Sequence, residues 1–353
     1  MSESDVTRDG VRGARPGREA VTSAHAGRRR GRRGRGEQPM VPEAEFASYY
    51  GTPVLNRPVW KPVDIAGYLF LGGLAGASSL LAAGGQLTGR PGLAAPAKFG
   101  AAGAISLSLV ALVHDLGRPA RFLNMLRVCK PTSPMSVGSW LLVGYAPLSL
   151  TAAATEVAGR YRMLGSAATA ASAVLGPAVA TYTAVLVSDT AVPAWHEGHR
   201  ELPFVFAGSA ASAASGLALA AAPAAEAGPA RRLAALGAVL ELGAFQVMKR
   251  RMGLAAEAYE QGRPRLLLRA AEALTAGGAV LALCSSGRRS RAVAAGAALL
   301  GGSAALRFAV FHAGVASAED PKYTVVPQRE RLSGGTAADV SPPPLGPPPV
   351  PPG

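Results

Sequence analysis

The sequence predicts an all-α membrane protein, a polytopic bundle of about eight transmembrane helices. Of its 353 residues, 49% are hydrophobic and only 16% are charged, whereas soluble proteins carry about 25% charged residues. The charges gather near the N-terminus and in short segments between apolar runs, and each run approaches the ~20 residues that span a bilayer. These patterns favour a multi-pass protein of the plasma membrane over a soluble chain.

The apolar runs predict eight helices between two polar tails. We expect them at residues 64–86, 96–114, 136–157, 164–188, 201–222, 231–248, 266–284 and 292–314. They are rich in Gly, Ala and Ser, small residues that let membrane helices approach closely. The seventh has the weakest pattern, because Arg269 and Glu272 stand in its first turns.

The chain divides into three segments. They are a basic tail at 1–45 that we expect to be disordered, the helix bundle at 46–315, and a proline-rich tail at 316–353. The run GRRRGRRGRG at 27–36 contributes much of the formal net charge of +14. No nucleic-acid-binding module follows it, so it fits a solvated arm near anionic lipid rather than a nucleic-acid partner.

The two tails are expected on the same side of the membrane, because the number of predicted helices is even. The loops on that side carry slightly more Lys and Arg than the opposite loops. The positive-inside rule therefore favours cytoplasmic termini.

One end of the predicted bundle gathers titratable side chains. Helices that finish on the side of the N-terminus end at or near His114, Asp115, Asp189 and His312. The first two lie in ALVHDLGRPARFLNML, where an apolar helix stops. Imidazole titrates near neutral pH, so a His–Asp pair at the membrane boundary can accept and donate protons. The alternative is an ordinary histidine interacting with a helix C-terminus.

Two charges stand at membrane depth. Glu241 and Arg307 each lie about seven residues before a predicted helix end, which is roughly 10 Å from the same face. If their helices are neighbours, we expect an ion pair. It would be either structural, or a proton relay in which Arg307 controls the protonation of Glu241.

Intrinsic redox cofactors are not expected. Cys129 and Cys284 are the only cysteines, and an iron–sulfur cluster needs about four ligands. His114 and His312 are the one histidine pair suited to haem, and both lie too near the membrane edge. No set of residues with good metal-ligand spacing is evident either.

Several stretches resemble one family. HDLGRPARFLNMLRVCKPTSPMSVGSWLL at 114–142 is similar to the signature of the NrfD/PsrC family, the quinone-handling membrane subunits of polysulfide reductase and related complexes. The segments YYGTPVLNRPVWKPVDIAGYLFLGGLAGASSLLAAG, TYTAVLVSDTAVPAWHEGHRELPFVFAGSAASAASG and FHAGVASAEDPKYTVVPQRER resemble other parts of it. The resemblance covers about 45–331.

The resemblance implies a membrane anchor with two protein partners. One is a four-cluster ferredoxin-like iron–sulfur subunit, and the other is a molybdopterin oxidoreductase that holds the catalytic centre. Electrons would pass between the clusters and an exchangeable menaquinone bound near the partner-facing side of this chain.

The resemblance also suggests roles for single residues. His114 is expected to donate a proton or hydrogen bond to the quinone, with Asp115 as the next carboxylate in the relay. The alternative for Asp115 is to cap the turn and pair with Arg118 or Arg121. Tyr68 and Tyr182 offer phenol donors, unless they are ordinary packing tyrosines, and Asp64 is the one polar candidate near the start of the first helix. The basic residues that follow the His–Asp pair are expected to dock the iron–sulfur partner or the phosphates of lipid: Arg118, Arg121, Arg127 and Lys130.

Two other functions stay open at this point. A purely structural anchor would lack a quinone site. A polytopic transporter would show internal repeats and a polar site near the midplane, and no convincing repeat is evident in the sequence.

Overall fold

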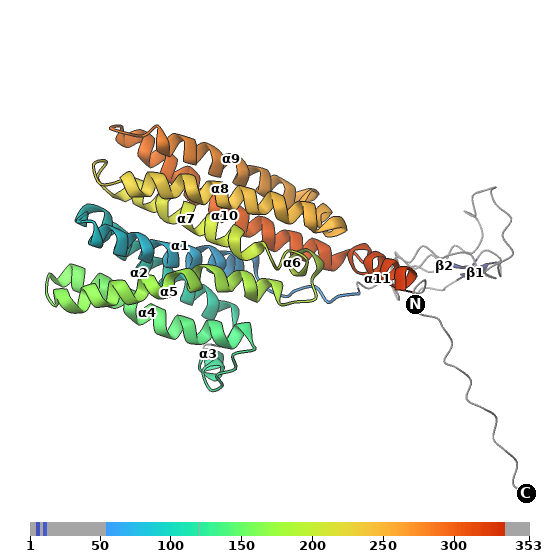
Figure 1. Cartoon of the computed structure of the whole chain (residues 1–353). Helices are drawn as coiled ribbons and strands as arrows, with labels where there is room; N and C mark the ends of the chain where they lie inside the picture. Colours follow the sequence, from blue (N-terminus) through green and yellow to red (C-terminus); the bar gives the residue numbers. More distant parts are fainter. Residues whose placement is uncertain (1–4, 8–9, 13–53, 119, 336–353) are drawn as a thin grey trace, which may run out of the picture. The chain divides into compact units, whose positions relative to one another are not determined.

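A computed structural model of the chain describes residues 5–7, 10–12, 54–118 and 120–335 (Figure 1). The chain forms two compact units, which are described separately: Arg57–Ala318, and the two ends Met1–Asn56 and Glu319–Gly353. The long helices are α1 (Pro62–Leu87), α2 (Pro91–Asp115), α4 (Pro134–Ala158), α5 (Arg162–Ser188), α7 (Leu202–Ala221), α8 (Gly228–Arg251), α9 (Gly262–Leu283) and α10 (Arg289–Glu319). Short helical segments lie between them: α3 (Ala120–Met125), α6 (Pro193–His196) and the 3-10 helix η2 (Gly253–Tyr259).

Seven of the described helices are long and apolar enough to cross a membrane: α1, α2, α4, α5, α7, α9 and α10. The expected all-α polytopic architecture is thereby confirmed. The predicted helix with the weakest pattern, at 266–284, corresponds to α9, which is long and apolar enough to cross a membrane. The exception among the eight is α8, because it carries basic residues in both its first and last turns and Glu241 between them.

Proline sets several helix starts. Pro62, Pro91 and Pro134 each occupy the first position of a long helix, where the missing N–H is no loss and the fixed φ suits the helix. For this reason α2 begins at Pro91, earlier than the expected residue 96, and Pro96 lies inside the helix.

The long helices form two groups that pack side by side. The first contains α1, α2, α4 and α5, and the second contains α7 to α10 (Figure 1). Contacts of α1, α2 and α5 with α7 join the groups. Glycines permit the closest crossings, because a Cβ at Gly76 of α1 would collide with the carbonyl oxygen of Gly176 of α5, and a Cβ at Gly296 of α10 with that of Gly216 of α7. This is the small-residue packing expected from the sequence.

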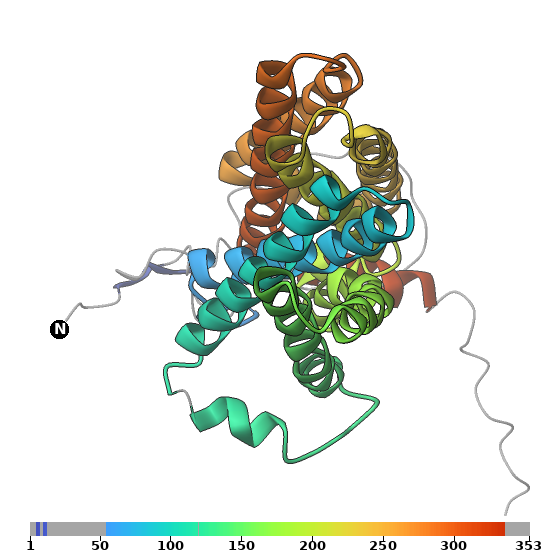
Figure 2. The same ribbon diagram turned by 90° about the vertical axis from the view of Figure 1, so that its left-hand side faces the viewer.

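The connection between α2 and α4 stands out from the side of the bundle (Figure 2). Its short helix α3 contacts α4, and none of its residues is buried. We call the end of the bundle where α2 finishes and α4 begins the cavity end, and the other end the far end.

The two chain ends contain few described residues. The strands β1 (Asp5–Thr7) and β2 (Gly10–Arg12) pair in antiparallel fashion, with Val6 opposite Val11. Helix α11 (Lys322–Gly335) lies within the segment expected to be a proline-rich tail. The arginine run at 27–36 and the proline-rich run after residue 340 are outside the described residues.

Candidate functional site

A cavity of about 240 Å³ lies at the cavity end of the bundle. The first turns of α1 and α4 and the last turns of α2 and α5 surround it, and Met125 of α3 also lines it. Most of its lining is apolar, and its polar side chains include Tyr68, Asp115 and Tyr182. A mostly apolar cavity with a few converging polar groups is typical of a small-molecule site.

Two tyrosines from different helices meet in this cavity. Tyr68 of α1 is 3% exposed and Tyr182 of α5 is 9% exposed, and a hydrogen bond joins their phenolic oxygens. Gly138 of α4 makes room for the ring of Tyr182. Each phenol can donate one hydrogen bond and accept others, so the pair presents a polar spot on an otherwise apolar wall.

Asp115 supplies the one carboxylate of the cavity lining. It is the last residue of α2, and its Oδ1 accepts a hydrogen bond of 3.3 Å from the backbone N–H of Lys61, just before α1. The chain turns away two residues later at Gly117, whose φ of 70° lies in the left-handed region that favours glycine. The helix end therefore places Asp115 at the edge of the cavity and ties its carboxylate to the start of α1.

His114 lies beside the cavity and not within its lining. Its Nδ1 is 2.8 Å from Oδ2 of Asp64, and its side chain is 62% exposed. It borders a separate shallow groove with Leu109, Val110 and Gly117. Asp115 and Tyr68 thus share the cavity with Tyr182, while His114 and Asp64 form their own pair on the neighbouring surface.

The four basic residues expected to dock a partner are all exposed. Arg118, Arg121, Arg127 and Lys130 lie in the connection between α2 and α4. Arg121 donates through Nη1 to the carbonyl of Leu116 at 3.0 Å. The side chain of Ser136 orders the segment further, because it accepts from the N–H of Lys130 and donates to the carbonyl of Val128. A basic surface therefore borders the cavity.

Glu241 of α8 and Arg307 of α10 are both buried, with exposures of 2% and 0%. The expected direct ion pair is wrong, because the two side chains turn to other partners. Oε1 of Glu241 accepts from Thr275 of α9 at 3.0 Å. Nη2 of Arg307 donates to the carbonyl of Phe206 in α7 at 3.0 Å, and its guanidinium lies 3.5 Å from the centre of that ring.

Several atoms of this buried pair remain without a hydrogen-bond partner in the described part of the chain. They are Oε2 of Glu241 and both Nε and Nη1 of Arg307. The charges of the two groups still act on each other. Orphan polar atoms are rare in protein interiors, where such groups usually bind protein or ordered water, so this centre is a second polar feature of functional interest.

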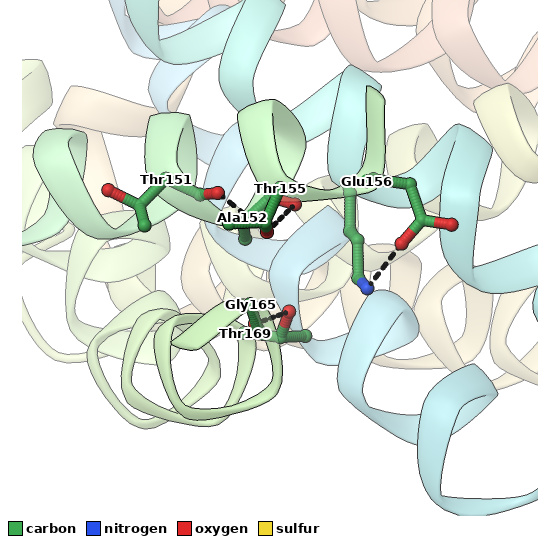
Figure 3. Close-up of polar contacts among 7 residues, drawn as sticks. Thr151, Ala152, Thr155, Glu156, Gly165 and Thr169 are labelled. Atoms are coloured by element: carbon green, nitrogen blue, oxygen red, sulfur yellow. Dashed lines mark hydrogen bonds and ion pairs between the residues drawn. The ribbon is translucent and has the colours of Figure 1, made fainter. Parts of the chain in front are cut away.

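The far end carries an ion pair that was not anticipated from the sequence. Nζ of Lys98 in α2 lies 2.9 Å from Oε2 of Glu156 in α4, drawn as a dashed line to Glu156 in Figure 3. Nearby Thr155 and Thr169 donate to carbonyls of their own helices (Figure 3). The sequence feature that could have indicated this ion pair is Lys98 itself, a lysine inside an apolar run. Such a residue needs a partner or access to water.

Sequence reasoning also missed an aromatic wall. Trp60 lines the cavity and stacks on Trp195, with ring centres 5.8 Å apart. Trp195 is 1% exposed and donates through Nε1 to the carbonyl of Val310 at 2.7 Å. The hydroxyl of Tyr259 donates a hydrogen bond to the carbonyl of Ala194, next to Trp195. Burial raises the pKa of this phenol above its usual range. Tryptophans before a first helix are expected at a membrane interface, so nothing in the sequence pointed to this wall.

Among the described residues, no three His, Cys, Asp or Glu side chains gather as they would to hold a metal ion. The cavity end combines a cavity, converging polar groups and a basic rim. A comparison with curated proteins finds no match. Residues 53–317 match the family model described as polysulphide reductase, NrfD, and the chain belongs to that family.

Proposed function

We propose that this protein exchanges electrons and protons between a partner's iron–sulfur clusters and membrane menaquinone, and that the quinone ring binds in the cavity beside Tyr68, Tyr182 and Asp115. The family makes the chain a membrane subunit of a polysulfide-reductase-type oxidoreductase complex. The observation that carries the quinone proposal is the cavity itself, an apolar space with a phenol pair and a carboxylate at the membrane edge.

The chemistry of the cavity suits quinone conversion. Quinone takes up two electrons and two protons to give quinol, and negative charge develops on its carbonyl oxygens. Phenol hydrogen bonds from Tyr68 or Tyr182 would stabilise that charge. Each quinone oxygen takes one proton. A phenol of the Tyr68–Tyr182 pair would donate to one oxygen and Asp115 to the other, and the His114–Asp64 pair on the adjacent surface would return both protons from water.

Electrons would pass between the quinone and the partner. We propose a ferredoxin-like iron–sulfur subunit bound to the surface of Arg118, Arg121, Arg127 and Lys130, with a molybdopterin oxidoreductase beyond it. Complementary charge steers and orients such contacts. In the plasma membrane, the termini of this chain would lie in the cytoplasm.

The buried Glu241–Arg307 centre is proposed as a site that holds a proton within the second helix group. Its support is the set of orphan atoms, Oε2 on the carboxylate and Nε and Nη1 on the guanidinium. Internal water could link them, because water commonly satisfies buried polar groups.

The decisive experiment measures quinone-linked turnover of the purified complex with a water-soluble menaquinone analogue. We expect Asp115→Asn and Tyr182→Phe to lower kcat/KM by about tenfold or more, since each removes a proton-transferring or hydrogen-bonding group. His114→Ala should have a smaller effect, because His114 acts through the surface pair. A matched control is Tyr145→Phe, which alters a buried tyrosine outside the cavity lining.

Two results would overturn the proposal. Unchanged turnover in Asp115→Asn and Tyr182→Phe would mean that the quinone does not react in this cavity. Intact complex that neither binds nor reduces the analogue would favour a purely structural anchor.

A further inference from the structure

A second groove lies on the side of the bundle, toward the far end. It has a volume of about 430 Å³, and its lining is contributed by α1, α5, α7 and α8. Its surface is largely apolar and includes Leu81, Gly84, Pro177 and Leu236. Leu236 is 68% exposed, so the groove opens on an outer side of the bundle.

Arg232, near the start of α8, is the one charged side chain of the groove lining in the described chain. Its Nη2 atom lies 3.9 Å from the position that a Cβ at Gly228 would take, and Nη2 of Arg231 lies at the same distance from that point. The two guanidinium groups therefore converge over the first turn of α8, at the end of the apolar groove.

No carboxylate of the described residues pairs with either arginine. The nearby acidic side chain, Glu226, is engaged elsewhere, because its Oε2 accepts from the backbone N–H of Leu93 at 3.1 Å. Arg231 makes one long hydrogen bond of 3.4 Å to the carbonyl of Ala224. Two neighbouring positive charges without a counter-ion repel each other, so an anion bound between them would relieve that repulsion.

We propose that the groove binds one anionic phospholipid, with its phosphate between Arg231 and Arg232 and one acyl chain along the apolar lining. Guanidinium groups match phosphate geometry, and basic pockets between membrane helices are suited to anionic headgroups. A phospholipid supplies both an anion at the membrane edge and an apolar chain at membrane depth. This site is separate from the cavity and does not depend on quinone chemistry.

The test is lipid binding to the full-length protein in detergent, titrated with fluorescent phosphatidylglycerol and with phosphatidylcholine of the same chains. The native protein should prefer phosphatidylglycerol. Each arginine near a membrane surface contributes about fivefold in affinity for an anionic lipid, so the double variant Arg231→Gln/Arg232→Gln should bind phosphatidylglycerol about 25-fold more weakly and lose the preference. The matched control Arg162→Gln removes an exposed arginine from the start of α5, also at the far end.

A second variant tests the acyl chain separately from the charge. Gly84 lines the groove, and a Cβ there would meet no atom within 4 Å. Gly84→Leu should fold normally, occupy the groove and weaken both lipids. Gly103→Leu in α2, at another exposed glycine with open space, is the control and should change neither.

Three results would overturn the proposal. Unchanged phosphatidylglycerol affinity in the double arginine variant would remove the phosphate site. Unchanged binding in Gly84→Leu would remove the acyl groove. Complete displacement of the lipid by millimolar inorganic phosphate would mean that the arginines bind a free anion without help from the groove.

Discussion

The ring of Tyr182 occupies the space that a side chain at Gly138 would need. A Cβ on Gly138 would lie 2.8 Å from Cδ2 of that ring and closer still to Cε2, a separation that real side chains do not tolerate. The absence of a side chain at this position of α4 thus lets α5 present the Tyr182 phenol to Tyr68. A glycine in the family-like stretch at 114–142 has a physical role in shaping the cavity.

Gly138→Ala should therefore displace the Tyr182 ring and weaken quinone binding. We expect KM for a menaquinone analogue to rise severalfold, while overpacking costs about 1–3 kcal/mol of stability. Gly144→Ala is the matched control in the same helix, because its Cβ would meet only Leu175 at an ordinary 3.7 Å. Equal kinetics in the two variants would contradict the role of Gly138.

The phenol pair should contribute to binding as well as to packing. Tyr68→Phe and Tyr182→Phe each remove one hydroxyl from the cavity, and we expect about a tenfold loss in kcat/KM, which corresponds to one hydrogen bond of ~1.4 kcal/mol. Tyr145→Phe removes a hydroxyl that bonds Ser79 and the carbonyl of Ala75 instead. It should cost stability and leave kcat/KM unchanged. A loss of stability without a kinetic effect in all three variants would make the cavity tyrosines purely structural.

The helices were predictable because length and apolar composition determine which segments can span a bilayer. The direction of single side chains was not. His114 and Asp115 are adjacent in the sequence, yet neighbouring positions of a helix point about 100° apart. One therefore lies in the groove beside α2, while the other lines the cavity. Sequence identified the pair, and the packing around α2 decides which member faces the cavity.

The partners of Glu241 and Arg307 were unpredictable for a related reason. Their depth in the membrane follows from counting residues along each helix. Their orientation depends on rotation about the helix axis, and a helix that is apolar on most faces gives little indication of that rotation. Contact with Thr275 and Phe206 required knowledge of how four helices pack together.

The aromatic wall should be visible by fluorescence. Trp60 lines the cavity on one side and stacks on Trp195 on the other, so a bound quinone ring is expected to quench its emission. Trp60→Leu should abolish most of the quinone-dependent quenching and raise the Kd for the analogue severalfold, since aromatic pairs contribute about 0.5–1.5 kcal/mol beyond burial. Trp140→Leu is the control, because Trp140 is exposed on α4 and does not line the cavity. Quenching that disappears only in that control would contradict the assignment.

The basic surface beside the cavity should control partner binding in a salt-dependent way. Substituting Gln for Arg118, Arg121 and Arg127 together should slow association with the iron–sulfur subunit and flatten its dependence on ionic strength. Quinone binding by the isolated chain should not change. Measuring association rates between 50 and 500 mM salt checks this, with Arg160→Gln/Arg162→Gln at the far end as the control. The same loss in both sets of variants would indicate a general effect of net charge.

The buried charges of α8 and α10 can be tested for coupling by a double-mutant cycle. Removing one member of a buried charged pair leaves the other uncompensated, at a cost of about 3–5 kcal/mol. We therefore expect Arg307→Met and Glu241→Gln each to lower the free energy of unfolding in detergent, and the double variant to lose less than the sum of the two. Additive losses would mean that Glu241 depends on Thr275 and Arg307 on Phe206, without interaction between them. In that case neither charge could regulate the other, and the proposed proton-holding centre would be reduced to two separate packing contacts.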